Sequence, residues 1–172
     1  MNKLVLGAAA IIAVALAMLA AAHASPIAPC SSGQVQISDA WGQGASGHYG
    51  TYLEFSLAPG ATPCTLTGYP GVDQTGPDAP VLHAERILSG FFPSGLPRGT
   101  DTPPTLVVSS WQPAYALVEG RAVDQQGQDC PKYDQLHVTA PDTTETVTLP
   151  TAVGCVLQIH PVGSGAPRPA TH

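Results

Sequence analysis

Ser46 and His48 lie two residues apart in a glycine-rich stretch and are the first candidates for chemistry. A serine becomes a nucleophile when a neighbouring histidine takes its proton, as in many hydrolases. The stretch Gly-Ala-Ser-Gly-His is not the G-x-S-x-G elbow, and the sequence places no acid to orient the histidine. We therefore assign no catalytic residue, and an exported hydrolase with a non-local site stays as an alternative function.

Residues 42–47 also match the dinucleotide fingerprint G-x-G-x-x-G letter for letter. In a dinucleotide-binding domain this loop leads into a helix, whose N-terminus holds the pyrophosphate. Here the residues from His48 to Leu53 continue as an alternating, strand-like run. We interpret residues 42–47 as a flexible connection between two strands, and we predict no cofactor.

Histidines are the remaining candidates for a ligand site, and those after the first 24 residues are His48, His83, His137, His160 and His172. Strand alternation places His48, His137 and His160 on outward faces. Two of them could meet across neighbouring strands and hold a metal ion together with a carboxylate such as Glu54. Since exposed strand histidines are more often solvated side chains, we predict no metal site and keep metal binding as a third hypothesis.

Four cysteines allow three disulfide pairings. We favour Cys30–Cys64 and Cys130–Cys155, because each bond then closes a moderate loop between successive strand regions. Bonds of that span stabilise a domain by roughly 3.5–4 kcal/mol each. No C-x-x-C arrangement is present, so the sequence does not favour a zinc site or a reactive thiol.

Aromatic residues could line a sugar- or peptide-binding face, although packing is the commoner role for such side chains. The candidates are Trp41, Tyr49, Tyr52, Tyr69, Phe91, Phe92, Trp111 and Tyr115.

Residues 1–24 have the pattern of a secretory signal peptide. Lys3 precedes an uninterrupted apolar run from Leu4 to Ala22, and Ala22-His23-Ala24 supplies a small-x-small cleavage site. We predict cleavage near Ala24, with the product secreted or associated with the cell wall. Export to an oxidising compartment also favours disulfides. The sequence after the leader contains no second apolar stretch of membrane-spanning length.

Composition indicates one acidic globular domain after the leader. Without Lys3, five basic side chains remain against twelve acidic ones, a net charge of −7. Scattered basic residues on an acidic chain do not favour binding to nucleic acid. We predict a single domain over residues 25–162 and a flexible tail over residues 163–172, which is rich in Gly, Pro and Ala.

Short apolar, β-branched runs between turn residues predict an all-β fold. Because glycine and proline, 18 of each, recur throughout, we expect no long helix after Ala24. The pattern favours a two-sheet antiparallel sandwich, immunoglobulin-like and held by two disulfides. The expected strands are 34–40, 49–57, 63–69, 81–88, 106–110, 114–123, 135–139, 144–149 and 153–161, with a long loop over 93–104.

The stretch Cys64-Thr-Leu-Thr-Gly-Tyr-Pro-Gly-Val72 resembles the C-T-L-x-G-Y-P-G-V signature of an exported actinobacterial family, the domain of unknown function 4232 family. Cys30, the Gly47-His48 pair and the two late cysteines are similar in position, so the resemblance spans about residues 30–162. It implies a β-sandwich with two disulfides and offers no established catalytic residues. Many family members are lipoproteins, but this chain lacks the lipid-attachment cysteine.

Together these patterns favour an exported, non-enzymatic domain that binds a ligand or an unknown partner at the cell envelope or outside it. Three observations favour this function: the predicted export, the rigid disulfide-linked scaffold, and the lack of a group of residues that the sequence places together for catalysis.

Overall fold

The computed structural model describes residues 25–165, and within that range every regular element is a β-strand. The strands are β1 (Val35–Ala45), β2 (His48–Leu57), β3 (Cys64–Thr67), β4 (Gly71–Gly76), β5 (Ala79–His83), β6 (Glu85–Arg86), β7 (Thr105–Val108), β8 (Ala114–Arg121), β9 (Gln135–Thr139), β10 (Thr146–Leu149) and β11 (Cys155–Ile159). The leader and its cleavage site fall outside the described residues, as do residues 166–172 of the expected tail. No helix within residues 25–165 has the length and apolarity needed to cross a membrane.

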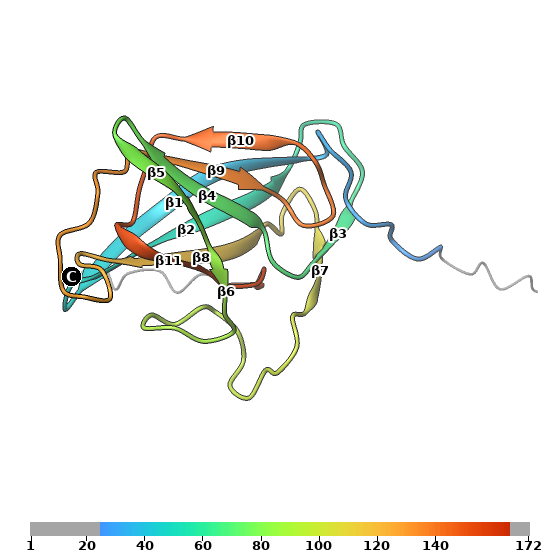
Figure 1. Ribbon diagram of the computed structural model, residues 1–172. Coiled ribbons are helices and arrows are strands. Elements are labelled where there is room, and N and C mark those ends of the chain that lie inside the picture. The colour runs from blue at the N-terminus through green and yellow to red at the C-terminus, as the bar shows by residue number, and fades with distance from the viewer. Residues whose placement is uncertain (1–24, 166–172) are drawn as a thin grey trace, which may run out of the picture.

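The strands form two large sheets and one small one. The five-stranded sheet has the order β1-β2-β8-β11-β6, the four-stranded sheet the order β10-β9-β4-β5, and β3 pairs with β7 alone. Figure 1 shows the two large sheets as two layers, with residues 87–104 looping out below them. Every strand pair is antiparallel except β11 with β6. The predicted all-β fold is confirmed, while the small third sheet and the parallel pair were not predicted.

The core lies between the two large sheets and follows the period-two alternation of the strands. On β2, Leu53 and Phe55 point inward and are fully buried, as the sequence predicts. Leu136 and Val138 of β9 face them from the four-stranded sheet. Burial of such large apolar side chains is the main force that holds the two layers together.

Both favoured disulfides are present, Cys30–Cys64 and Cys130–Cys155. They span 34 and 25 residues of sequence, so each restricts a moderate loop of the unfolded chain. The first ties the N-terminal segment to β3, and the second ties the segment between β8 and β9 to the start of β11.

Two predicted boundaries are wrong for reasons of local geometry. Strand β1 continues to Ala45, so Gly42 and Gly44 belong to the ladder with β2, and only Ser46-Gly47 form the turn. Both turn residues have positive φ, 51° and 75°, which is the geometry of a tight two-residue hairpin. Strand β4 was missed because Tyr69-Pro70-Gly71 reads as a turn, whereas pairing with β9 begins at Gly71 itself.

The long loop, residues 87–104, covers part of the outer face of the five-stranded sheet. Tyr52 alternates outward as predicted, yet it is fully buried because Phe92 and Leu117 pack with it. The Tyr52 hydroxyl donates a hydrogen bond to the carbonyl of Pro93. Burial raises the pKa of the Tyr52 phenol; the neighbouring Gln43 side chain opposes this shift, and the Glu119 carboxylate adds to it.

Candidate functional site

The β1–β2 hairpin, the β4–β5 turn and the segment between β8 and β9 all lie at one end of the sandwich, on the left in Figure 1. Residues from these three segments and from the segment before β11 line a cleft. Its volume is about 520 Å³ and its lining is mostly apolar, as is typical of sites for small ligands and peptide side chains. We call it the terminal cleft, and its lining consists of Tyr49, Pro77, Pro131, Lys132, Tyr133, Asp134, Ala152, Val153 and Gly154.

The floor of the terminal cleft is held in place by Gln74, a fully buried residue of β4. Its Oε1 accepts a hydrogen bond of 2.9 Å from the N–H of Val153, and its Nε2 donates to the carbonyl of Gly154. One buried amide thus satisfies a backbone donor and a backbone acceptor. Gly154 has a φ of 90°, and a Cβ there would overlap the carbonyl of Arg121, so the floor requires glycine to lie against β8.

The wall formed by residues 131–134 is fixed on both of its sides. The Cys130–Cys155 disulfide attaches its start to β11. Further along, the carbonyl of Lys132 lies against Gly76, where a Cβ would overlap it, and the N–H of Asp134 donates to the carbonyl of Thr75 at 3.0 Å. The wall and the floor therefore have their positions without a ligand, and preformed sites lose less entropy on binding.

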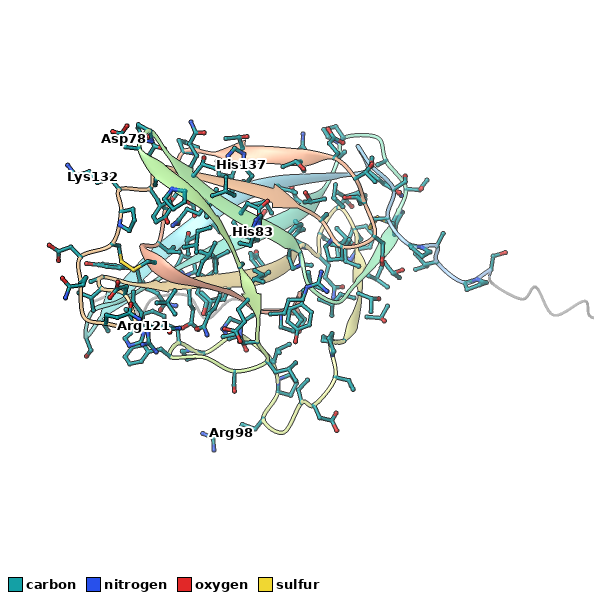
Figure 2. The ribbon with its side chains drawn as sticks, viewed as in Figure 1. Asp78, His83, Arg98, Arg121, Lys132 and His137 are labelled. Carbon is teal, nitrogen blue, oxygen red and sulfur yellow. A yellow bond between two sulfur atoms is a disulfide. The ribbon has the colours of Figure 1, made fainter. Side chains whose placement is uncertain are left out.

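The polar side chains of the terminal cleft have no hydrogen-bond or ion-pair partners within residues 25–165. Neither the Tyr49 nor the Tyr133 hydroxyl makes a hydrogen bond there. Lys132 and Asp134 are exposed and form no ion pair in this part of the chain. Figure 2 shows the Lys132 side chain projecting outward at this end of the molecule, with Asp78 on the nearby β4–β5 turn. These groups are available to bind a ligand.

A buried acid–histidine pair lies beneath the long loop. The Nε2 of His160 is 2.7 Å from Oε1 of Glu119, and the two side chains are 0% and 2% exposed. The same carboxylate accepts hydrogen bonds from the N–H groups of Phe91, at 2.9 Å, and Phe92, at 3.3 Å. The prediction that His160 is a solvated outer-face residue is wrong, because the long loop covers that face. The buried pair therefore anchors the long loop to the five-stranded sheet.

Ser46 and His48 are not assembled into a hydrolytic site in the described part of the chain. Ser46 occupies the exposed hairpin turn, while the His48 ring stacks on Phe91 with ring centroids 3.9 Å apart. No hydrogen bond joins Ser46 to His48, or His48 to a carboxylate, among residues 25–165. The stack instead supports Phe91, whose side chain is 49% exposed.

Two further histidines lie on the outer face of the four-stranded sheet (Figure 2). Nδ1 of His83 is 2.6 Å from Oδ1 of Asp73, and the His137 ring lies between the hydroxyls of Thr75 and Thr148, at 2.9 and 3.0 Å. The suggested carboxylate ligand Glu54 belongs to the other sheet. Within residues 25–165 no three His, Cys, Asp or Glu side chains are grouped to hold a metal ion. His172 lies outside the described residues.

The aromatic candidates have different positions. Trp41 packs against Tyr52 and Tyr115, with ring centroids 4.9 and 5.9 Å apart, on the outer face of the five-stranded sheet. Trp111 is 82% exposed on the turn between β7 and β8. Tyr49 lines the terminal cleft together with Tyr133, a residue that the sequence analysis did not single out. The sequence feature that could have indicated Tyr133 is its place in the Pro-Lys-Tyr-Asp run directly after Cys130. A disulfide at Cys130 fixes the start of that run.

One comparison with known proteins identifies a relationship. The model of a family described as a domain of unknown function (DUF4232) matches residues 30–164. No curated protein and no solved structure matches the chain.

Proposed function

The chain belongs to the DUF4232 family of domains of unknown function, and from its own geometry we propose that it is an exported, non-enzymatic domain that binds a partner at the cell envelope. We assign the contact to the terminal cleft. The signal-peptide pattern and the two disulfides support an extracytoplasmic location.

The observation that carries the proposal is that the terminal cleft is preformed. A disulfide, the buried Gln74 amide and a glycine contact fix its wall and floor, while its polar side chains have no partners within residues 25–165. A fold gains no stability from leaving an apolar cleft of about 520 Å³ open to water. Preformed apolar clefts that carry a few polar groups are typical binding sites for small ligands and peptides.

The experiment is affinity capture from an envelope extract with the mature chain and three variants. Tyr49→Ala and Tyr133→Ala remove the two aromatic rings of the cleft lining. Trp111→Ala is the control, because it removes a more exposed aromatic side chain from a turn outside that lining. Capture should fall at least about tenfold in the two cleft variants, a loss of about 1.4 kcal/mol, and stay unchanged in the control. Equal capture by all four proteins would reject the cleft as the contact site. Melting temperatures of the variants test that each is folded.

A further inference from the structure

The lining of the terminal cleft has the chemistry of a surface for extended, proline-containing peptides. Two tyrosine rings, Tyr49 and Tyr133, stand with Pro77 and Pro131 around an apolar floor. A polyproline II segment has no internal hydrogen bonds, so its carbonyls need outside donors, and its pyrrolidine rings pack well on aromatic faces. The two phenol hydroxyls, which have no hydrogen bond within the described residues, are donors of the required kind.

Charge selects the side chain that accompanies the proline. Asp134 and Lys132 both line the cleft and do not pair with each other in the part of the chain that the structure describes. Residues 25–172 carry a net charge of −7, from five basic and twelve acidic side chains. An acidic protein attracts cationic ligands over a distance of about a Debye length, roughly 8–10 Å. The overall charge therefore favours a basic residue beside the proline, and within the cleft Asp134 is the carboxylate that such a residue can contact, away from Lys132.

We propose that the terminal cleft binds an extended peptide in which proline is next to arginine or lysine. This inference rests on the proposed function and names the partner chemistry of the same site. The prolines pack between Tyr49 and Tyr133, the phenol hydroxyls donate to peptide carbonyls, and the basic side chain contacts Asp134. A polyproline II segment is already extended before it binds, so a small cleft can hold it at a modest cost in conformational entropy.

The test is an NMR titration of the ¹⁵N-labelled mature chain with a synthetic peptide, Ala-Pro-Arg-Pro-Ala-Thr-His, which is the sequence of residues 166–172. Saturable shifts should appear in the lining residues with a Kd below about 1 mM. Tyr133→Ala and Asp134→Asn should each weaken binding at least about fivefold, and Trp111→Ala should leave it unchanged. A peptide with alanine in place of both prolines should bind at least about tenfold more weakly. The titration is repeated on the Arg168→Ala chain, so that the chain's own copy of the sequence competes less.

Three results would overturn the inference: no shifts up to millimolar peptide in either chain, binding that survives Tyr133→Ala, or equal binding of the proline-free peptide. A neutral oligosaccharide such as cellohexaose serves as the second probe, and its binding to the cleft in place of the peptide would assign the site to glycans. If envelope capture depends on Tyr133 but the peptide does not bind, the result supports the proposed function and rejects the proline-containing peptide as its ligand. If the Tyr133→Ala substitution also leaves envelope capture unchanged, both the proposed function of the cleft and the peptide ligand are rejected.

Discussion

Replacing Gln74 by leucine tests whether one buried amide holds the floor of the terminal cleft. The side chain is fully buried, and it bonds the N–H of Val153 and the carbonyl of Gly154. Leucine has nearly the same volume but no polar atoms, so both backbone groups lose their partner. An unpaired buried donor or acceptor costs about 1–3 kcal/mol, so the substitution should lower the free energy of unfolding by about 2–6 kcal/mol.

Urea denaturation followed by tryptophan fluorescence measures this loss, with Gln158→Leu as the control. Gln158 lies half-buried on β11, so its replacement should change the free energy of unfolding by less than about 1 kcal/mol. Hydrogen exchange at the amide of Val153 supplies a local readout, and its protection should fall more than that of the β2–β8 ladder. A Gln74→Leu chain that is destabilised by less than about 1 kcal/mol would refute the assignment of Gln74 as the support of the floor.

The charged variant Gln74→Glu distinguishes the contribution of the hydrogen bond to Gly154 from that of the hydrogen bond to Val153. An ionised carboxylate can accept from Val153, but it repels the carbonyl of Gly154, to which the amide donates. A protonated acid restores one donor. Relative to the native chain at the same pH, Gln74→Glu should therefore be less destabilised at pH 4 than at pH 7. A penalty that does not change with pH would show that the contact with Gly154 is unimportant.

Three other predictions concern the rest of the fold. Glu119→Leu should lower the free energy of unfolding, measured by urea denaturation, by about 3–5 kcal/mol and loosen the long loop. The reason is that the substitution leaves the buried His160 and two backbone N–H groups without their acceptor. A loss below about 1 kcal/mol would contradict this role of Glu119. The raised pKa of Tyr52 favours its neutral form in the folded state, so this phenol stabilises the fold fully below about pH 10 and its contribution is lost as the pH rises further. In an absorbance titration of the native protein, Tyr52→Phe should remove a phenol ionisation that occurs above the ordinary tyrosine pKa of about 10. An unchanged titration in this range would be evidence against the raised pKa. Replacing Cys130 and Cys155 together by serine should lower the free energy of unfolding by about 3.5 kcal/mol, as expected for a bond that spans 25 residues; equal denaturation midpoints with and without the bond would contradict a structural role.

The sequence predicted those parts of the fold that local pattern determines. Alternation located the strands that carry Leu53 and Leu136. Pro and Gly marked the loop over residues 93–104, whereas the observed loop begins earlier, at residue 87. Strand β4 was missed because a Tyr-Pro-Gly turn and the start of a strand overlap at Gly71. Local pattern is a poor guide wherever the pairing partner, in this case β9, lies far away in the sequence.

The terminal cleft and the buried Glu119–His160 pair could not be predicted, because each is assembled from separate segments. Tyr49, Pro77, Tyr133 and Val153 come together only through the pairing of distant strands and one disulfide. Glu119 interrupts an otherwise apolar strand, a signal that some partner must satisfy a buried charge. The sequence does not say that the partner is His160, since β8 and β11 are neighbours only in space.

The most direct test of the account places a photo-crosslinking amino acid, p-benzoylphenylalanine, at position 133 in the terminal cleft and, in a second chain, at the exposed position 111. Both chains are irradiated with an envelope extract, and the crosslinked species are identified by mass spectrometry. The account predicts a discrete partner crosslinked from position 133 and not from position 111. Identical crosslinks from both positions, or none from position 133 while the partner is captured, would contradict it.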